Sequence, residues 1–367
     1  MIDYLFIASL VFLIPVAIVS LYNLLTAPVI RKWNKSSEDA GLISVLIPAR
    51  NEEGNISESL TNLLTQDYTN LEILVLDDES SDNTGSHVTE FSHKDPRVKL
   101  ISGQPLPPEW LGKNWACHQL SLAASGNLLI FLDADVKLIP SSISNLLFLR
   151  HKYPGFNMLS VFPTQIYNSF GEKLIVPLMN WILLAFLPLR FIYTKQNPSF
   201  VAANGQLILI DRKSYDLIGG HTAVKDCVVE DMELARLIKT NNLKLVTAVG
   251  GDSVFCKMYD GFGTAFNGFS KNFFAGFNTN PFIFILMLLV FEIFFLLLPV
   301  LSFLNPVFLI PVALILFNRI AISAVAHRNL ILDIILHPLQ MILLFIIGIN
   351  SIIKFKQRKL TWKDRKI

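Results

Sequence analysis

The chain has 367 residues, of which 52% are hydrophobic and only 16% are charged, and its formal net charge is +2. This hydrophobic share exceeds that of an ordinary soluble domain, and the small net charge excludes a strong general attraction to nucleic acid. The three cysteines, Cys117, Cys227 and Cys256, show neither CxxC nor CxxH spacing. We therefore expect no disulfide framework and no zinc site, and we predict three buried, small apolar side chains in a reducing compartment.

The first apolar stretch predicts a membrane anchor in residues 1–30. No charged residue lies between Asp3 and Arg31, and this length exceeds the roughly 20 residues that cross a bilayer. No convincing A-x-A cleavage motif follows, so the stretch is interpreted as an anchor rather than a removed signal peptide. Arg31, Lys32 and Lys35 come directly after it. Because positive charges favour the cytoplasmic side, the following domain is predicted to be cytoplasmic and the protein to lie in the plasma membrane.

The middle of the chain, residues 41–280, is predicted to form one α/β domain. Runs typical of buried strands alternate with runs of helical spacing. The strand runs are 42–49, 71–78, 97–102 and 127–136, and the helical runs are 55–68, 80–91 and 113–126, the last ended by Gly126. This alternation predicts right-handed βαβ units in a doubly wound sheet, whose ligands bind at the carboxyl ends of the strands. Neither GxGxxG nor GxxxxGK[ST] occurs, so no dinucleotide fingerprint or P-loop is indicated.

Three of the predicted strands end in polar clusters, "ARNEE", "DDESSDN" and "DADV". In the last cluster Asp133 and Asp135 follow a strongly apolar strand and, as alternate residues, point the same way. Two carboxylates at such a place are costly unless a positive charge faces them. Carboxylate oxygens are the ligands that Mg²⁺ or Mn²⁺ prefers. The alternative is a strand-to-loop turn that the aspartate side chains stabilise.

The last third of the chain is apolar again. Between residues 282 and 317 the only charged residue is Glu292, and "LSFLNP" at 301–306 predicts a turn between two crossings. The segment 330–353 is also apolar, and the tail 354–367 contains seven Lys or Arg. Because the positive-inside rule favours a cytoplasmic tail, we predict two crossings within 282–326 and a re-entrant or interfacial segment at 330–353. Three full crossings within residues 281–353 are the alternative.

Two further segments are predicted to lie in the membrane interface. Residues 174–194 are apolar but contain two prolines and Arg190, and a crossing there would separate "VED" from "DAD". We therefore expect an interfacial helix that includes Trp181. The second segment, near 262–278, contains six phenylalanines that would contact a lipid acceptor or only anchor the protein: Phe262, Phe266, Phe269, Phe273, Phe274 and Phe277.

Successive motifs of the chain resemble those of the inverting family 2 glycosyltransferases. They are "SVLIPARNEE", "ILVLDDESSDNT", "GKNWACHQLSLAASGNLLIFLDADV" and "VVEDMELARLI". "GGH" at 219–221, "YDGFGTAFNGFSKNFFAGF" and the tail "LTWKDRKI" are most similar to membrane-bound members that glycosylate carotenoid acids, with hopanoid-associated and ceramide enzymes next. The resemblance implies an α/β catalytic domain of the GT-A type, with a Rossmann-like mixed sheet, between N-terminal and C-terminal transmembrane helices.

The resemblance also implies a set of site residues. Asp231 would be the catalytic base, oriented by Glu230, and Asp133 and Asp135 would hold Mg²⁺ or Mn²⁺. The nucleotide-sugar donor would be bound by Ala49, Asn51, Glu52, Asp77, Asp78, Lys113, Asp133 and Lys271. The acceptor side would include Gln206, His221 and Trp362.

Several of these residues have a purely structural role as the alternative. Ser80 and Asp82 would simply cap the next helix, Lys113 would be a solvated surface lysine, and Glu230 with Asp231 would be favourable acids at a helix start.

The chain departs from processive and ceramide-type relatives because it has no Gln-x-x-Arg-Trp motif. Lys271, or Trp362 and Arg365 in the tail, are candidates to replace it. The missing motif and the few crossings argue against a polymer-extruding synthase and a transporter. We therefore predict transfer of a single sugar, glucose from UDP-glucose, to a carotenoid or polyisoprenoid lipid. The alternatives are a GDP-linked donor, a polyprenyl phosphate, glycerolipid, ceramide-like or cell-wall acceptor, and an inactive membrane scaffold.

Overall fold

The computed structural model describes residues 2–33, 40–277, 279–357, 361–362 and 365–366. These divide into two compact units. The sheet unit comprises Pro28–Ile166, Phe191–Lys257 and Thr361–Ile367, and the helical unit comprises Met1–Ala27, Tyr167–Arg190 and Met258–Leu360. Lys35, expected to contribute to the positive flank of the anchor, lies outside the described residues.

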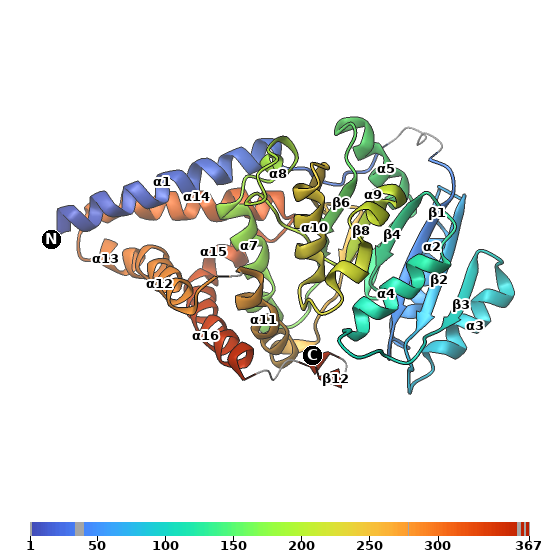
Figure 1. The fold of residues 1–367 in the computed structure, drawn as a ribbon. Helices are drawn as coiled ribbons and strands as arrows, with labels where there is room; N and C mark the ends of the chain where they lie inside the picture. Colours follow the sequence, from blue (N-terminus) through green and yellow to red (C-terminus); the bar gives the residue numbers. More distant parts are fainter. Residues whose placement is uncertain (1, 34–39, 278, 358–360, 363–364, 367) are drawn as a thin grey trace. The chain divides into compact units, whose positions relative to one another are not determined.

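The sheet unit is built on a seven-stranded mixed sheet with the order β3-β2-β1-β4-β8-β6-β9 (Figure 1). Its strands are β1 Ile43–Ala49, β2 Leu71–Asp77, β3 Val98–Ser102, β4 Leu128–Leu132, β6 Met158–Phe162, β8 Leu207–Asp211 and β9 Leu245–Val249. Strands β1 to β4 pair in parallel, whereas β8 runs antiparallel to β4 and β6. The predicted strands and the expected mixed sheet are confirmed.

The central strands are apolar throughout because layers of side chains cover both of their faces. Every residue of β1 and of β4 is buried. The helices of this unit are α2 Ile56–Leu64, α3 Thr84–Lys94, α4 Gly112–Ala123, α5 Ser142–Lys152, α9 Arg212–Leu217, η1 Gly220–Val224 and α10 Glu230–Thr240. Helix α4 packs against β1 and β2, and α2 packs against α3. The sheet thus forms a rigid platform for the residues at its strand ends.

Gly126 has a different role from the predicted helix end, because α4 already ends at Ala123. A Cβ at Gly126 would lie 2.6 Å from the Leu42 carbonyl oxygen. Its backbone N–H also donates to Ser44 Oγ at 2.8 Å. The glycine therefore permits the loop before β4 to approach β1 closely.

A second, three-stranded sheet follows the end of β4. It contains β5 Val136–Leu138, β7 Thr164–Gln165 and β10 Val254–Cys256, with β10 in the middle. Val136 pairs with Cys256, which also pairs with Gln165. This small sheet therefore brings Cys256 beside the segment that carries Asp135. A short hairpin of β11 Thr361–Trp362 and β12 Arg365–Lys366 is the last element of the chain.

The helical unit contains most of the long apolar helices. The helices of this unit are α1 Ile2–Thr26, α6 Phe170–Ile175, α7 Pro177–Phe186, α11 Gly261–Phe277, α12 Pro281–Phe291, η2 Glu292–Leu297, α13 Leu298–Ser302, η3 Pro306–Phe308, α14 Leu309–Val325, α15 Leu330–Ile335 and α16 His337–Lys356. Helix α8 Leu189–Thr194 has residues in both units. Four stretches are long and apolar enough to cross a membrane: Ile2–Thr26, Pro281–Ser302, Pro306–Val325 and His337–Lys356. Helices α1 and α14 pack along each other (Figure 1).

The C-terminal helices leave a turn where one was predicted, and the segment predicted to be re-entrant forms two helices. The turn lies between the end of α13 at Ser302 and the start of η3 at Pro306. The segment 330–353 forms the short helix α15 and the 20-residue helix α16. Since α16 has the length and apolarity of a crossing, its geometry favours the alternative of three C-terminal crossings.

The segment 174–194 forms three short helices, and its tryptophan is not at a surface. Trp181 is fully buried, its indole N–H donates to Asn318 Oδ1 at 2.9 Å, and the Arg319 guanidinium lies over its ring. The expectation of Trp181 at a membrane interface is therefore wrong, because the ring forms part of the core of the helical unit. Asn23 fixes the same segment, since its Nδ2 donates to the carbonyls of Leu184 and Leu187.

The phenylalanines of α11 also divide into two groups. Phe269, Phe273 and Phe274 are buried, and the rings of Phe273 and Phe274 pack edge-on against Phe284 of α12. Of the six phenylalanines expected to face lipid, these three therefore serve the interior of the helical unit.

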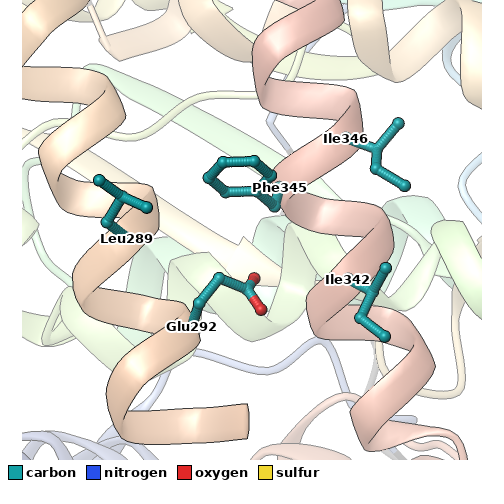
Figure 2. Close-up of a pocket in the computed structure, with 5 residues that line it drawn as sticks. All are labelled: Leu289, Glu292, Ile342, Phe345 and Ile346. Atoms are coloured by element: carbon teal, nitrogen blue, oxygen red, sulfur yellow. The ribbon is translucent and has the colours of Figure 1, made fainter. Parts of the chain in front are cut away.

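Two glutamates of the helical unit differ sharply in their surroundings. Glu172 accepts hydrogen bonds from the backbone N–H groups of Asn168 and Gly261 and from Ser169 Oγ, at 2.6 to 2.8 Å. Glu292 lines an apolar hollow of about 160 Å³ between η2 and α16. Figure 2 shows its carboxylate between the two helices, close to Phe345. Its buried Oε1 has no hydrogen-bond partner among the described residues.

We predict opposite effects on stability when these two glutamates are neutralised. Glu292→Leu should raise the melting temperature of the detergent-solubilised protein, because a buried polar atom without a partner costs about 1–3 kcal/mol. Glu172→Gln should lower it, because an amide NH₂ group cannot accept from a backbone N–H. Thermal unfolding of both variants checks this. A fall for Glu292→Leu as large as that for Glu172→Gln would contradict the contrast.

Candidate active site

The three polar clusters lie at the same edge of the seven-stranded sheet. Strands β1 and β2 pair in parallel with Ala49 opposite Asp77, and β4 pairs in parallel with the other side of β1. Their carboxyl ends therefore meet, so that "ARNEE", "DDESSDN" and "DAD" are brought together, as expected for parallel strands.

The first two clusters are tied to each other by short hydrogen bonds. Asn51 adopts a left-handed backbone conformation with φ of 52°. Its backbone N–H donates to Ser80 Oγ at 3.0 Å, and its Oδ1 accepts from the Ser81 N–H at 2.9 Å. The Glu52 N–H donates to Thr84 Oγ1 at 2.8 Å. Asparagine tolerates this conformation better than most residues, so the turn after β1 is held in one shape against the start of α3.

The aspartates after β2 differ in exposure. Asp78 is 2% exposed, and its N–H donates to the Ala49 carbonyl at 2.8 Å. Asp77 is partly exposed and accepts from the Ser80 N–H at 3.0 Å. Asp82 accepts from the N–H and hydroxyl of Thr84, at 3.0 and 2.5 Å. The capping alternative is thus confirmed for Asp82, and Asp77 is the more accessible member of the pair.

Lys113 lies at the centre of an acidic cluster. Its Nζ lies 2.8 Å from Asp133 Oδ1 and 3.5 Å from Glu230 Oε1. Burial disfavours the ammonium form, but the carboxylates of Asp133 and Glu230 outweigh it and hold the pKa of Lys113 well above its ordinary value. The alternative of a solvated surface lysine is therefore wrong, because Lys113 links the end of β4 to the start of α10.

Asp231 follows Glu230 at the start of α10 and is bound on both carboxylate oxygens. Oδ2 accepts from the Gly205 N–H at 2.7 Å, and Oδ1 accepts from the Met232 N–H at 2.8 Å. The pKa of Asp231 is raised to about 7, first by burial and then by the Glu230 carboxylate, while Lys113 lowers it. A carboxylate that titrates near neutral pH suits a general base.

Gly205 permits this close arrangement. A Cβ there would lie 3.2 Å from Glu230 Oε1 and 3.3 Å from Lys113 Nζ. Such contacts are tighter than those of ordinary side chains, so any larger residue at position 205 would displace the cluster. None of the motifs quoted from the sequence contains this glycine. Its N–H and its missing side chain both serve the two carboxylates at the start of α10.

Asp135 lies beyond the end of β4 and has an oxygen without a partner. Its Oδ1 is buried and accepts no hydrogen bond among the described residues. The pKa of Asp135 is raised to about 7, first by burial and then by the Asp133 and Glu52 carboxylates. The edge therefore carries an excess of negative charge that Lys113 alone does not balance, and a divalent cation fits the donor set of Asp133 and Asp135.

The residues expected on the acceptor side are placed differently. Gln206 and His221 are 4% and 3% exposed. His221 Nδ1 lies 2.8 Å from the Tyr215 hydroxyl, and its ring packs against Phe131. Burial lowers the pKa of His221 to about 3. Both side chains belong to the interior of the sheet unit, and their contact with an acceptor stays a prediction.

Lys271 and Trp362 are not assigned to this edge by the structure. Lys271 lies on α11 of the helical unit, so its relation to the edge stays a prediction. Trp362 is in β11, and its side chain is outside the described part of the chain.

The surroundings of the cysteines were not fully predicted from the sequence. All three are free, and Cys117 and Cys256 are buried as predicted, whereas Cys227 is only half-buried. The Cys256 thiol is not in apolar surroundings, because it accepts from Gln206 Nε2 at 2.8 Å, and the backbone of Cys256 pairs with Val136, the neighbour of Asp135. Only the pairing of β10 with β5 brings these distant residues together.

Comparison with known proteins finds a family match for part of the chain. Residues 44–201 match the family model described as glycosyl transferase family 2. The chain is 27% identical over 262 residues to 4,4'-diaponeurosporenoate glycosyltransferase of Staphylococcus haemolyticus, a match that covers 70% of this chain and 67% of that protein. A Staphylococcus aureus protein of the same name is 27% identical over 64% of this chain, which spans 61% of that relative's length.

A shorter match has a higher sequence identity. Over 97 residues, 26% of this chain and 36% of the other, the chain is 41% identical to an Escherichia coli UDP-Glc:alpha-D-GlcNAc-diphosphoundecaprenol beta-1,3-glucosyltransferase. Among solved structures, a mannosyltransferase from Pyrobaculum calidifontis in complex with GDP-Man and Mn²⁺ superposes with a TM-score of 0.56 at 17% identity, covering 98% of this chain and 100% of that one. That likeness shows a shared GT-A-type fold, and the match of residues 44–201 identifies a glycosyl transferase family 2 domain within the chain.

Proposed function

We propose that this glycosyltransferase transfers glucose from UDP-glucose to a polyisoprenoid lipid at the membrane surface, by metal-dependent inverting displacement. One observation carries the proposal. Lys113, the paired carboxylates after β4 and the paired carboxylates at the start of α10 converge at one edge of a family 2 domain. Direct displacement needs a base on one side of the sugar and charge neutralisation at the leaving diphosphate on the other. The pair at the start of α10 would supply the base, and the pair after β4 would hold the cation that neutralises the diphosphate.

Asp133 and Asp135 would hold the divalent cation. The orphaned Oδ1 of Asp135 is the atom that supports this assignment, since a buried oxygen without a partner is otherwise unfavourable. The bound cation would act as a Lewis acid toward the diphosphate. Lys113 holds Asp133 in place through its 2.8 Å contact and adds a fixed positive charge beside the cluster.

Asp231 would accept the proton of the attacking acceptor hydroxyl or acid. The N–H groups of Gly205 and Met232 fix its carboxylate in one orientation. Glu230 raises the pKa of Asp231 toward neutral pH and is itself held 3.5 Å from Lys113. Glu230 is therefore a positioning residue, and Asp231 is the group that contacts the reacting atom.

The donor nucleotide would lie over the ends of β1 and β2. Ala49, Asn51 and Glu52 form the turn around the base and ribose, and Asp77 and Asp78 offer carboxylate acceptors for the imide N–H of uracil. The glucosyltransferase named above for UDP-Glc supports a uridine donor, whereas the mannosyltransferase in complex with GDP-Man keeps a guanosine donor as the alternative.

The acceptor is inferred from the relatives and from the helical unit. The names of the staphylococcal relatives specify a carotenoid acid, and four apolar helices of this chain have the length of membrane crossings. A plasma-membrane location is part of the proposal, and the positive charges after α1 support a cytoplasmic sheet unit. A diphosphoundecaprenol-linked sugar is the second candidate acceptor, because a 97-residue stretch that is 41% identical matches an enzyme named for it.

The acceptor prediction is tested in a bacterial host that makes a polyisoprenoid acid. Expression of the wild-type chain should add a hexose to that acid, as read by mass spectrometry of lipid extracts, whereas Asp231→Asn should reduce the product by roughly 10²–10⁴-fold. A hexose on diphosphoundecaprenol-linked sugars would support the second acceptor instead. A changed soluble oligosaccharide with no altered lipid would contradict both.

The base assignment predicts a particular pH dependence. Because the carboxylate form of Asp231 is active and its pKa is raised to about 7, kcat/KM should rise with pH through that region. Glu230→Gln removes a negative charge that raises this pKa, so the rising limb should move to lower pH. Initial rates of donor and acceptor turnover across pH 5 to 9 check both statements, with the range set around that pKa.

The control is the matched substitution of Glu233, which lies two residues beyond Asp231 and is bound by Arg236. Glu233→Gln should leave the limb in its wild-type position. An unchanged limb in Glu230→Gln, or an equal shift in both variants, would sink the assignment of the limb to Asp231.

A further inference from the structure

Helix α10 carries the candidate base, Asp231, but begins without a side-chain cap. Its N-cap residue is Val229, whose apolar side chain cannot accept a hydrogen bond from the first turn. A serine, threonine, asparagine or aspartate at this place would tie the helix start to its own backbone. The start of α10 therefore depends on other elements that hold the base segment, the residues 224–229 that directly precede the helix.

The side chain of Asn114, in the first turn of α4, holds the base segment. Its Nδ2 lies 2.8 Å from the carbonyl oxygen of Val224, 3.0 Å from that of Cys227 and 3.2 Å from that of Lys225. Because a carbonyl oxygen can only accept, the atom that faces all three is the amide nitrogen. Leu111 adds a backbone N–H that donates to the Lys225 carbonyl at 2.8 Å. Asn114 is 1% exposed, so water competes little for these bonds.

Helix α4 itself gives no reason for an asparagine at this position. Asparagine is among the weaker helix formers, and the N-cap of α4 is Leu111 rather than Asn114. The neighbouring Lys113 contacts the carboxylates of Asp133 and Glu230. Two consecutive residues of α4 thus hold the first side chain of α10 and the backbone that leads into it.

We propose that Asn114 is a positioning residue for the base: its amide fixes the base segment, so that Asp231 is held where it would meet the acceptor. The inference rests on the proposed role of Asp231. A shift of the base segment would move the start of α10 and lengthen the 2.7 Å bond from the Gly205 N–H to Asp231. The three bonds of Asn114 reach the base segment and not the ends of β1 and β2, so its loss should impair transfer more than donor binding.

The first test measures hydrogen–deuterium exchange of the full-length, detergent-purified protein by mass spectrometry. Asn114→Ala removes the three bonds, so the backbone amides of residues 224–233 should exchange roughly tenfold faster than in wild type. Asn114→Asp keeps the size of the side chain but places a carboxylate, which cannot donate, against three carbonyl oxygens. It should accelerate exchange at least as much. Wild-type protection in Asn114→Asp would overturn the inference, because packing alone would then hold the segment.

The second test separates the base from the donor. In the same bacterial host, Asn114→Ala should reduce the hexosylated lipid by roughly 10- to 100-fold at equal protein level, because a small displacement of a reacting group costs this much. The affinity of the purified variant for UDP in the presence of Mn²⁺, measured by calorimetry, should stay within about threefold of wild type. A loss of UDP affinity as large as the loss of transfer would overturn the inference.

The matched control is Asn145→Ala on α5 of the same unit. Asn145 is 2% exposed, donates from Nδ2 to Ser253 Oγ at 3.0 Å and accepts from the Trp33 N–H at 2.8 Å. Its removal should lower the melting temperature and leave both the exchange of residues 224–233 and the hexosylated lipid at wild-type level. Equal changes in the two asparagine variants would overturn the inference, because a general loss of stability would account for them.

Asp231→Asn distinguishes the inference from the proposed function. If this variant loses the hexosylated lipid while Asn114→Ala keeps wild-type exchange and transfer, the positioning role alone is overturned. Wild-type transfer in Asp231→Asn would overturn the base assignment and the inference with it. If Asn114→Ala does not fold, Asn114→Ser takes its place. Since serine keeps one donor, the same changes are expected in smaller measure, and wild-type behaviour again overturns the role.

Discussion

The constraint on which this structure depends is an excess of carboxylates at one edge of a buried sheet. Asp133, Glu230 and their neighbours Asp135 and Asp231 are served by one lysine, Lys113, which contacts Asp133 and Glu230 directly. Burial and the neighbouring carboxylates raise the pKa of Asp135 and of Asp231. The divalent cation proposed for Asp133 and Asp135 would supply the missing positive charge.

The topology of the sheet determines which carboxylate has which neighbours. Because β4 runs parallel to β1, Asp133 and Asp135 emerge at the edge where the turns after β1 and β2 lie. The antiparallel strand β8 enters the sheet at this edge, so that the residues just before it, Asn204 to Gln206, pass beside the same carboxylates. One polar loop thereby supplies the Gly205 N–H to Asp231 and the Gln206 side-chain amide to Cys256.

The sequence was informative wherever chemistry and local structure coincide in one short motif. "LLIFLDADV" combines an apolar strand with the two carboxylates that follow it, and "VVEDMELARLI" combines a helix start with the candidate base, so both were found in the right elements. Long-range pairing was not predictable in the same way. Nothing near Cys256 in the sequence indicates Asp135, because β10 pairs with β5 across more than a hundred residues. His221 and Gln206 were assigned to an acceptor by position in a motif, and their burial could only be seen once the sheet was assembled.

The apolar segments show a second property that could not be predicted from the sequence, namely which side chains face lipid and which face another helix. Composition identifies Trp181 and the phenylalanines of α11 as hydrophobic, but it does not distinguish a side chain that faces lipid from one that faces another helix, because both surroundings are equally apolar. Polar partners make the distinction instead. Trp181 donates to Asn318, whose own Nδ2 donates to Ser20 of α1, so three apolar helices are joined by two hydrogen bonds in their interior. An isolated Asn or Ser on an otherwise apolar helix face therefore indicates that this face points into the protein. It does so more reliably than a tryptophan on the same helix.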